Sequence, residues 1–127
     1  MSPDEAADHL ARLLGRTALG DRSAFSGLYA AARSKLFAVT LRIVRDRALA
    51  EEVLQDSFVS IWKHAGDYAR AKSAPMTWMA AIVRNRSLDV LRRTREEPDP
   101  EGSLAANLVD ESAAPARDAE ARAQAHA

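Results

Sequence analysis

Several residue types are absent or rare in this sequence, and each absence excludes a class of protein. The chain has no cysteine, so disulfides, thiolate chemistry and cysteine-ligated metals are excluded. Charged residues interrupt every apolar stretch, so none reaches the length of a membrane span. The first five residues contain neither a basic leader nor an apolar core, which predicts no signal peptide. We therefore expect a soluble cytoplasmic protein without membrane insertion.

Residues that support catalysis are also rare. The three histidines, His9, His64 and His126, are scattered, and none has a second histidine at metal-ligand spacing. No glycine-rich phosphate loop is present, and the serines and threonines lack a histidine and an aspartate arranged for nucleophilic catalysis. The sequence therefore predicts a protein that is not an enzyme and that holds no metal or cofactor.

Charge is distributed unevenly along the chain, although the formal net charge of the whole is +0. Residues 10–95 contain 16 Lys and Arg against 7 Asp and Glu, which gives a net charge of +9. Residues 96–127 contain 2 against 8, and residues 1–9 carry a net charge of −3. A basic body is suited to binding phosphate, whereas an acidic tail is repelled by phosphate or competes with it for the same surface.

Apolar residues recur at helical spacing, and no segment alternates as a strand does. Four helices are expected, over residues of about 4–16, 21–43, 47–65 and 75–95. Asp46 is a candidate N-cap for the third helix, and Pro75 suits the first turn of the fourth. Gly15 and Gly20 are expected to bracket the end of the first helix, and Gly66 to end the third.

Two of the expected helices have a well-defined apolar face. In the second helix, intervals of three and four residues persist for five turns, through Phe25, Leu28, Tyr29, Ala32, Leu36, Val39 and Ile43. A further strip on the same helix, of Phe37, Leu41 and Val44, implies burial on more than one side. On the fourth helix we expect one stripe, made of Trp78, Ile82, Asn85 and Leu88.

The character of the sequence changes after Arg95. The segment Glu-Glu-Pro-Asp-Pro-Glu-Gly-Ser cannot continue a helix, and the remainder contains no aromatic residue. Such a segment cannot bury enough apolar surface to order itself, although residues 118–127 could form a nascent helix. The predicted fold class is therefore all-α, a compact bundle of three to four helices with a disordered acidic C-terminal tail.

The end of the expected fourth helix is strongly basic, with five arginines against one acid, Asp89. Successive residues turn about 100° around a helix, which separates the arginines into two rows. The first row is Arg84, Arg92 and Arg95, and the second is Arg86 and Arg93. Two such rows can follow a phosphate backbone while the stripe between them approaches bases. A solvated helix end that complements its own dipole is the alternative, but five arginines exceed what the dipole needs.

The expected loop before the fourth helix, residues 67–74, combines aromatic and basic residues. Tyr68 and Trp78 provide flat rings, while Arg70 and Lys72 provide charge beside Ser73. Single-strand binding uses these ingredients, because bases stack on rings and cations neutralise phosphates. In the alternative interpretation Trp78 belongs to the core and Tyr68 anchors the loop.

Two further polar features allow both a structural and a functional interpretation. Asn85 needs partners for up to four hydrogen bonds, so it either caps a neighbouring backbone or reads the edge of an inserted base. The expected third helix has an acidic and amide face, made of Glu51, Glu52, Gln55 and Asp56. This face is either solvated or a docking surface for a basic partner helix.

Four motifs occur in order along the chain. The first is Phe25-x-x-Leu28-Tyr29, and the second is Leu41-Arg42-Ile43-Val44-Arg45-Asp46. The third is Ala50-Glu51-Glu52-Val53-Leu54-Gln55-Asp56-Ser57-Phe58-Val59-x-x-Trp62. The fourth is Trp78-Met79-x-x-Ile82-Val83-Arg84-Asn85-Arg86-x-Leu88-Asp89-x-Leu91-Arg92-Arg93. Together they resemble region 2 of bacterial sigma-70-type RNA polymerase sigma factors of the extracytoplasmic function (ECF) group.

The resemblance implies a helical domain that binds core RNA polymerase and that recognises and melts the promoter −10 element. The third helix would dock on the clamp coiled coil of the largest polymerase subunit, through Glu51, Glu52, Gln55, Asp56 and Trp62. The loop and the fourth helix would bind the non-template single-stranded DNA of that element. The residues implied are Tyr68, Arg70, Lys72, Ser73, Trp78, Arg84, Asn85, Arg86, Arg92 and Arg93.

The resemblance also divides the chain. It places an N-terminal helix at 1–18, the region 2 domain at 19–95 and an acidic, flexible inter-domain linker at 96–127. The family has a second helical domain, whose helix-turn-helix reads the −35 element, and residues 96–127 do not supply one. Factors of this group are commonly held inactive by an anti-sigma factor, so an inhibitor is implied as a second protein partner. The alternative function is a helical protein- or RNA-interaction module without promoter recognition.

Overall fold

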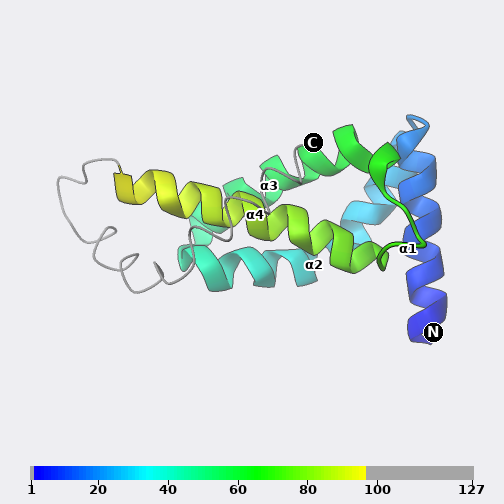
Figure 1. The fold of residues 1–127 in the computed structure, drawn as a ribbon, viewed down its shortest axis with the longest axis horizontal. Coiled ribbons are helices and arrows are strands. Elements are labelled where there is room, and N and C mark those ends of the chain that lie inside the picture. The colour runs from blue at the N-terminus through cyan, green and yellow to red at the C-terminus, as the bar shows by residue number, and fades with distance from the viewer. Residues whose placement is uncertain (1, 97–127) are drawn as a thin grey trace.

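The computed structural model describes residues 2–96, which form four α-helices and one short 3₁₀ helix (Figure 1). In chain order these are α1 (Pro3–Ala18), α2 (Arg22–Val44), α3 (Arg47–His64), η1 (Ala65–Asp67) and α4 (Pro75–Glu96). No strand occurs within residues 2–96, so the predicted all-α class is confirmed. The predicted acidic tail, its nascent helix at 118–127 and His126 lie outside the described residues.

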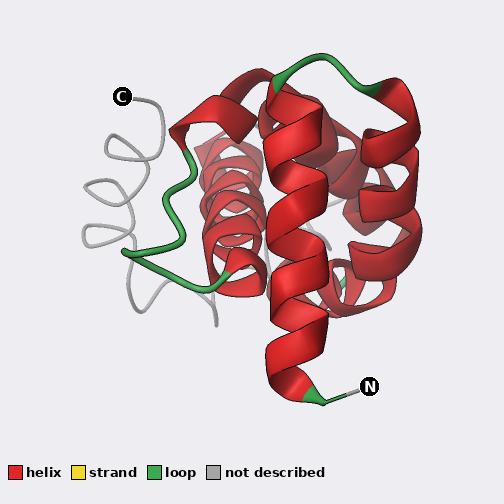
Figure 2. Ribbon diagram, turned by 90° about the vertical axis from the view of Figure 1, so that its right-hand side faces the viewer, coloured by secondary structure: helices red, strands yellow, loops and turns green. Residues whose placement is uncertain are grey.

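One helix covers an end of the bundle, and the loop before α4 lies at one side of it. Helices α2, α3 and α4 run lengthwise beside one another, and α1 crosses one end of them (Figure 1). Figure 2, viewed from that end, shows α1 in front and the loop between η1 and α4 projecting to one side. None of the helices in residues 2–96 has the length and apolar character needed to cross a membrane.

Local capping explains where the helices begin. The Asp21 carboxylate accepts a hydrogen bond from the Ala24 amide at 3.0 Å, and Asp46 caps α3 in the same way. The Ala24 amide, followed by the Arg16 guanidinium at 2.7 Å, holds the pKa of the Asp21 carboxyl below its ordinary value. Both contacts favour the charged carboxylate, which also suits the positive end of the α2 dipole.

Of the predicted helix ends, one is confirmed and one is wrong in detail. Gly15 and Gly20 bracket the end of α1 as expected, although the helix continues to Ala18 and buries Thr17 in its last turn. Gly20 provides the stop, with a φ of 88° that favours glycine. Gly66 lies within η1, so α3 ends two residues earlier, at His64, and its last turn tightens into a 3₁₀ helix.

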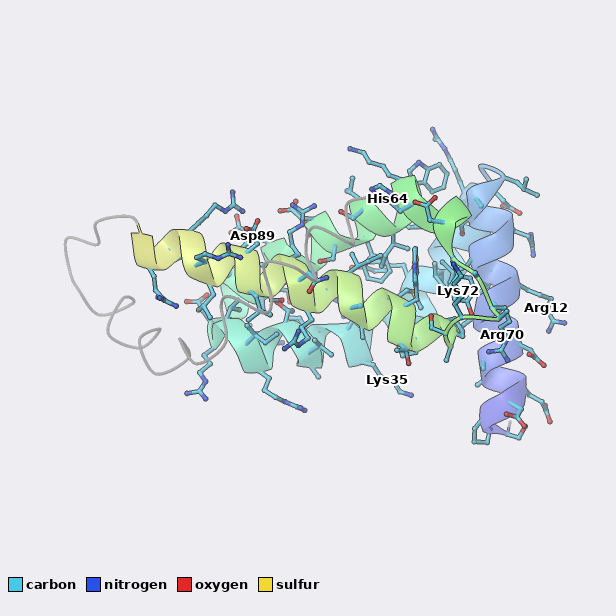
Figure 3. All side chains as sticks on the ribbon, viewed as in Figure 1. Arg12, Lys35, His64, Arg70, Lys72 and Asp89 are labelled. Atoms are coloured by element: carbon cyan, nitrogen blue, oxygen red, sulfur yellow. The ribbon has the colours of Figure 1, made fainter. Side chains whose placement is uncertain are left out.

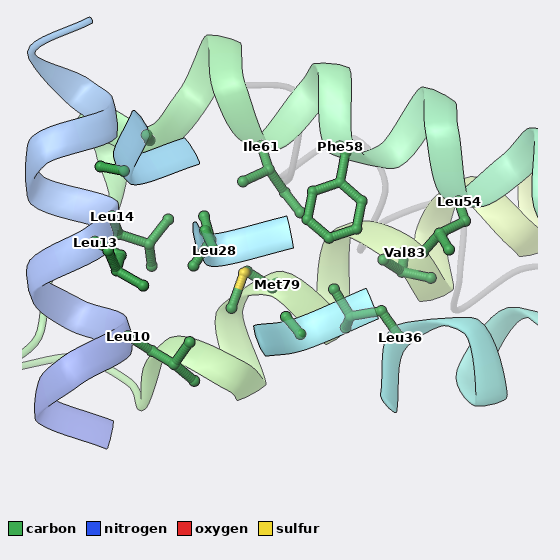
Figure 4. Packing of buried hydrophobic residues seen from close by; sticks show 13 residues of the cluster. Leu10, Leu13, Leu14, Leu28, Leu36, Leu54, Phe58, Ile61, Met79 and Val83 are labelled. Atoms are coloured by element: carbon green, nitrogen blue, oxygen red, sulfur yellow. The ribbon is translucent and has the colours of Figure 1, made fainter. Parts of the chain in front are cut away.

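The core lies where all four helices meet (Figure 4). Helix α1 covers the end of the bundle with three leucines, and α2, α3 and α4 each contribute residues that are almost completely buried. The main members are Leu10, Leu13, Leu14, Leu28, Leu36, Leu54, Phe58, Ile61, Met79 and Val83. Because α1 is part of this core, the helix that crosses the end of the bundle is firmly held beside the loop.

The buried row of α4 differs from the predicted stripe. Three residues of that stripe, Trp78, Ile82 and Leu88, are only partly buried. The row that faces the core lies one position along and repeats every four residues, through Met79, Val83, Ser87 and Leu91. The misassignment has a simple cause. The buried row contains a polar residue, Ser87, which made it look less apolar, whereas the large Trp78 made the neighbouring row look apolar.

Ser87 belongs in that row because its hydroxyl is satisfied there. Its Oγ lies 2.7 Å from the carbonyl oxygen of Val83 and 2.8 Å from Oγ1 of Thr40 on α2. Ser87 and Thr40 are both completely buried. The pair therefore links α2 to α4 through a buried hydrogen bond, and neither hydroxyl is left without a partner.

Replacing Ser87 by alanine is expected to lower the free energy of unfolding by about 1–3 kcal/mol, because the Thr40 hydroxyl loses its buried partner. Urea unfolding followed by far-UV circular dichroism measures this change. The double variant Ser87→Ala with Thr40→Val removes both hydroxyls and is expected to recover most of the loss. A double variant no more stable than Ser87→Ala would show that the hydrogen bond contributes nothing.

Candidate nucleic-acid and protein interfaces

One side of α4 presents an aromatic, an amide and a basic side chain in a line. Trp78, Asn85 and Arg92 are seven residues apart, so they lie almost above one another, with about 10 Å between neighbours. Asn85 is two positions from Val83 and from Ser87, which turns it roughly 200° away from the buried row. We call Trp78, Asn85 and Arg92 the outer stripe of α4. The stripe points away from the buried row but is not fully exposed, because Asn85 is 6% exposed, Trp78 is half-buried and two nitrogens of Arg92 are buried.

The loop of residues 68–74 leads directly into this stripe and is closed by its own hydrogen bonds. The Tyr68 hydroxyl donates to the carbonyl oxygen of Ser73 at 2.9 Å. The Ala69 carbonyl oxygen accepts from the amides of Lys72 and Ser73 at 2.9 and 3.3 Å. The Tyr68 ring packs edge-on against Trp78, with 5.6 Å between centroids. The loop is therefore preformed, and both rings also pack against the core.

A second contact joins the loop to α1. Arg70 Nη2 donates to Asp8 Oδ1 at 3.0 Å (Figure 3). Hydrogen bonds that Arg70 donates to Asp8 and, with a smaller effect, to Tyr68 raise the pKa of its guanidinium. Sequence reasoning missed Asp8, and no local signal could have found it, because the two residues are 62 positions apart. Arg70 is thus charged and already engaged, whereas the neighbouring Lys72 is simply exposed.

The two predicted arginine rows face different surroundings. Arg86 donates to Ser60 Oγ on α3 at 2.8 Å, and Arg93 lies 3.8 Å from Asp89. This row is turned toward α3. In the other row Arg84 is exposed, while Nε and Nη2 of Arg92 are buried without a hydrogen-bond partner. The arginines are therefore not equivalent, and the Arg84 and Arg92 row is the one beside Asn85.

The residues predicted to bind a protein partner lie on the face of α3 that points away from the core. Glu52, Gln55 and Asp56 are exposed, and Glu51 and Trp62 are half-buried at its edge. Two grooves flank this face, one between α2 and α3 and one between α3 and α4. Gln55 lines both of them, so it lies at the centre of the face.

The groove between α2 and α3 is aromatic and almost entirely apolar. It has a volume of about 250 Å³ and is lined by Phe25, Tyr29, Gln55, Phe58, Val59 and Trp62. Its rings form a connected cluster, with 5.2 Å between the centroids of Phe25 and Trp62 and 4.8 Å between those of Tyr29 and Phe58. Val59 is 51% exposed in its wall. Sequence analysis did not assign Val59, although its position one turn after Gln55 on an exposed face was the available signal.

The groove between α3 and α4 is polar by contrast. It has a volume of about 350 Å³ and is lined by Leu49, Glu52, Val53, Gln55, Asp56, Val90 and Arg93. Its carboxylates come from α3 and its guanidinium from α4. Within residues 2–96 there is no cluster of three or more histidine, aspartate or glutamate side chains that could hold a metal. The arrangement is suited to binding macromolecules on two surfaces.

Comparison with known proteins gives a consistent result. Residues 28–97 match the family model described as Sigma-70 region 2. The chain is 29% identical over 108 residues to "ECF RNA polymerase sigma factor SigK" of Mycobacterium ulcerans (strain Agy99), covering 85% of this chain and 58% of that protein. It is 32% identical over 98 residues to the protein of the same name from Mycobacterium sp. (strain KMS), covering 77% and 51%. The chain spans about half the length of the curated relatives it matches.

Proposed function

The chain belongs to the sigma-70 region 2 family, and we propose that it docks on core RNA polymerase and recognises and melts the promoter −10 element to initiate transcription. The observation that carries this proposal is the alignment of the outer stripe with the preformed loop. Together they place two rings, an amide and several cations along one path. In this role the chain performs no catalysis of its own and acts in the cytoplasm.

On the strand side, each residue type has a separate task. Tyr68 and Trp78 offer aromatic rings on whose faces an unpaired base can stack, and the loop gives that base a preformed surface. Asn85 carries an amide whose donors and acceptor suit a base edge, and a bound strand would have to uncover this side chain and replace the partner that it has within the chain. Arg84, Arg92 and Lys72 follow the phosphates, which positions the strand without reading its sequence. Arg86 and Arg93 are turned toward α3 and belong to the scaffold, so their contribution to the strand is smaller.

On the protein side, the face of α3 has the composition of an interface. Its apolar centre is the aromatic groove with the exposed Val59, and its rim carries Glu52, Gln55 and Asp56. An apolar centre with a polar rim is typical of specific protein contacts. The acidic rim suits a basic helix, which supports the clamp coiled coil of the largest subunit as partner. An anti-sigma factor that covers this face is the second protein partner we propose.

Within the chain we assign residues 19–95 to the domain that carries both surfaces, residues 1–18 to a supporting helix and residues 96–127 to an acidic linker. In the proposed mechanism α3 fixes the domain on polymerase, and α4 with its loop holds the non-template strand once the duplex opens. A flipped base loses its stacking in the duplex, and stacking on the loop compensates for that loss, which favours opening.

Binding of fluorescent single-stranded DNA tests the strand surface. The chain is expected to prefer a −10-like non-template strand over its complement, with an affinity that falls steeply as salt increases. Asn85→Ala is expected to relax the base preference about tenfold while changing overall affinity little, and Arg92→Ala to weaken binding to all strands similarly. Fluorescence anisotropy at two salt concentrations measures both effects.

Lys35→Ala is the matched control, because Lys35 is an exposed cation that belongs to α2 and to neither the loop nor α4 (Figure 3). It is expected to leave both affinity and preference nearly unchanged. Equal binding to any strand sequence by the unaltered chain would favour the alternative, a helical protein- or RNA-interaction module.

A further inference from the structure

The loop of residues 68–74 is tied to a helix outside the part of the chain that matches the family. Asp8 lies in α1, whereas the match begins at residue 28. Three leucines of α1 are buried in the core, Leu10, Leu13 and Leu14, so the backbone that carries Asp8 is fixed. Figure 3 places Arg70 directly beside α1. A carboxylate is therefore held at the edge of the proposed strand-binding surface.

The contact between Asp8 and Arg70 uses the chemistry by which a guanidinium binds phosphate. A carboxylate and a phosphate both offer anionic oxygens to the same N–H donors. The side chains of Arg70 and Asp8 are 47% and 61% exposed, so the pair lies in water, where such pairs are weak and exchange readily. A phosphate that approaches Arg70 must displace or share this carboxylate, and it meets a negative charge in doing so.

We propose that Asp8 is an internal competitor for phosphate at Arg70, and that it weakens the attraction of the loop for the DNA backbone. The inference rests on the proposed function, because it concerns the same strand surface. In the free chain Asp8 satisfies Arg70, and a strand that is held by the loop and the outer stripe exchanges a phosphate for the carboxylate. Backbone attraction alone is thereby reduced, and the contacts to bases carry a larger share of the binding.

Asp8→Asn tests the proposal, since the amide keeps an acceptor oxygen and removes the charge. Binding of the −10-like single strand is expected to tighten about two- to fivefold at low salt, the range of an exposed ion pair. The slope of log affinity against log salt is expected to steepen by about 0.7, which corresponds to one further phosphate contact on a single strand. Fluorescence anisotropy of the full chain over a salt series measures both quantities.

Two variants separate this effect from a general change of charge. Asp4→Asn makes the same charge change on the same helix, and the Asp4 side chain has no hydrogen bond or ion pair within residues 2–96. It is expected to change the affinity by much less than Asp8→Asn. In an Arg70→Gln background, Asp8→Asn is expected to have no effect. Unchanged or weaker binding of Asp8→Asn, or tightening that persists without Arg70, would overturn the proposal.

A strand of abasic deoxyribose phosphate distinguishes this inference from the proposed function. If Asp8→Asn binds the abasic strand more tightly than the unaltered chain does, and only when Arg70 is present, the competitor role is supported. This holds even if the chain shows no preference for −10-like DNA. If the chain prefers −10-like DNA but Asp8→Asn changes neither the affinity nor the salt slope, the proposed function is supported and the competitor role is rejected. A chain that binds neither strand rejects both. Far-UV circular dichroism verifies that each variant is folded.

Discussion

Replacing Val59 by arginine is expected to reduce binding to core RNA polymerase by about a hundredfold, the loss typical of a central interface residue. Val59 is half-exposed in the wall of the aromatic groove, between Gln55 and Trp62. A guanidinium at this position keeps its water and prevents an apolar partner from reaching the rings of the groove. The substitution also places a cation where a basic helix is proposed to dock. Surface plasmon resonance with immobilised core enzyme measures the affinity.

The design includes a control for folding and one for charge. Val59 already faces solvent, so the variant is expected to keep the helical circular dichroism and the unfolding free energy within about 0.5 kcal/mol. Ser34→Arg introduces the same side chain at an exposed position of α2 and is expected to bind polymerase normally. Asp56→Arg is expected to lose binding as well, because it reverses the charge of the acidic rim. Normal polymerase affinity in Val59→Arg would refute the assignment of this face.

Replacing Leu28 by alanine is expected to lower the free energy of unfolding by about 3 kcal/mol. Leu28 is 0% exposed and lies near the centre of the cluster, between residues of α1, α3 and α4 (Figure 4). The loss includes the transfer free energy of the removed methyl groups and the cavity that remains, since three neighbouring helices cannot all move inward. Chemical unfolding in urea measures the change.

Leu28→Met serves as the comparison, because it conserves volume and is expected to lower stability by less than about 1.5 kcal/mol. A small domain has only about 5–15 kcal/mol of stability in total. Leu28→Ala therefore removes a large share of it and should also weaken strand binding through the unfolded fraction. If Leu28→Ala were as stable as Leu28→Met, the packing around Leu28 would be looser than the structure indicates.

The features that sequence predicted well are local ones. Asp21, Asp46 and Pro75 mark helix starts because the hydrogen bond or ring geometry involved lies within one turn of the residue itself. Arg45 illustrates the opposite case. It ends α2 with a φ of 56°, a left-handed conformation for which glycine or asparagine is the usual signal. Nothing in the arginine side chain favours that conformation, so the residue type did not predict the end of α2.

In the candidate site, too, only the local features could be predicted from the sequence. The spacing of Trp78, Asn85 and Arg92 is visible in the sequence, so their common side of α4 follows from helix geometry alone. The different surroundings of the two arginine rows could not be predicted, because Arg86 donates a hydrogen bond to Ser60, a residue of α3 that is 26 positions away. The ion pair of Asp8 with Arg70 spans still more of the chain. Contacts of this kind depend on the tertiary arrangement, which a periodic pattern does not encode.

The hydrogen bond from Arg86 to Ser60 also limits how the two surfaces can move. It joins the middle of α4 to the C-terminal part of α3, beside a core in which Phe58 and Ile61 of α3 share one cluster with Met79 and Val83 of α4. The shared core and this hydrogen bond favour a fixed offset between the proposed partner surface on α3 and the proposed strand surface on α4. Any adjustment to a different strand falls to side-chain rotamers and to residues 68–74, which confines the variable part of recognition to a few positions.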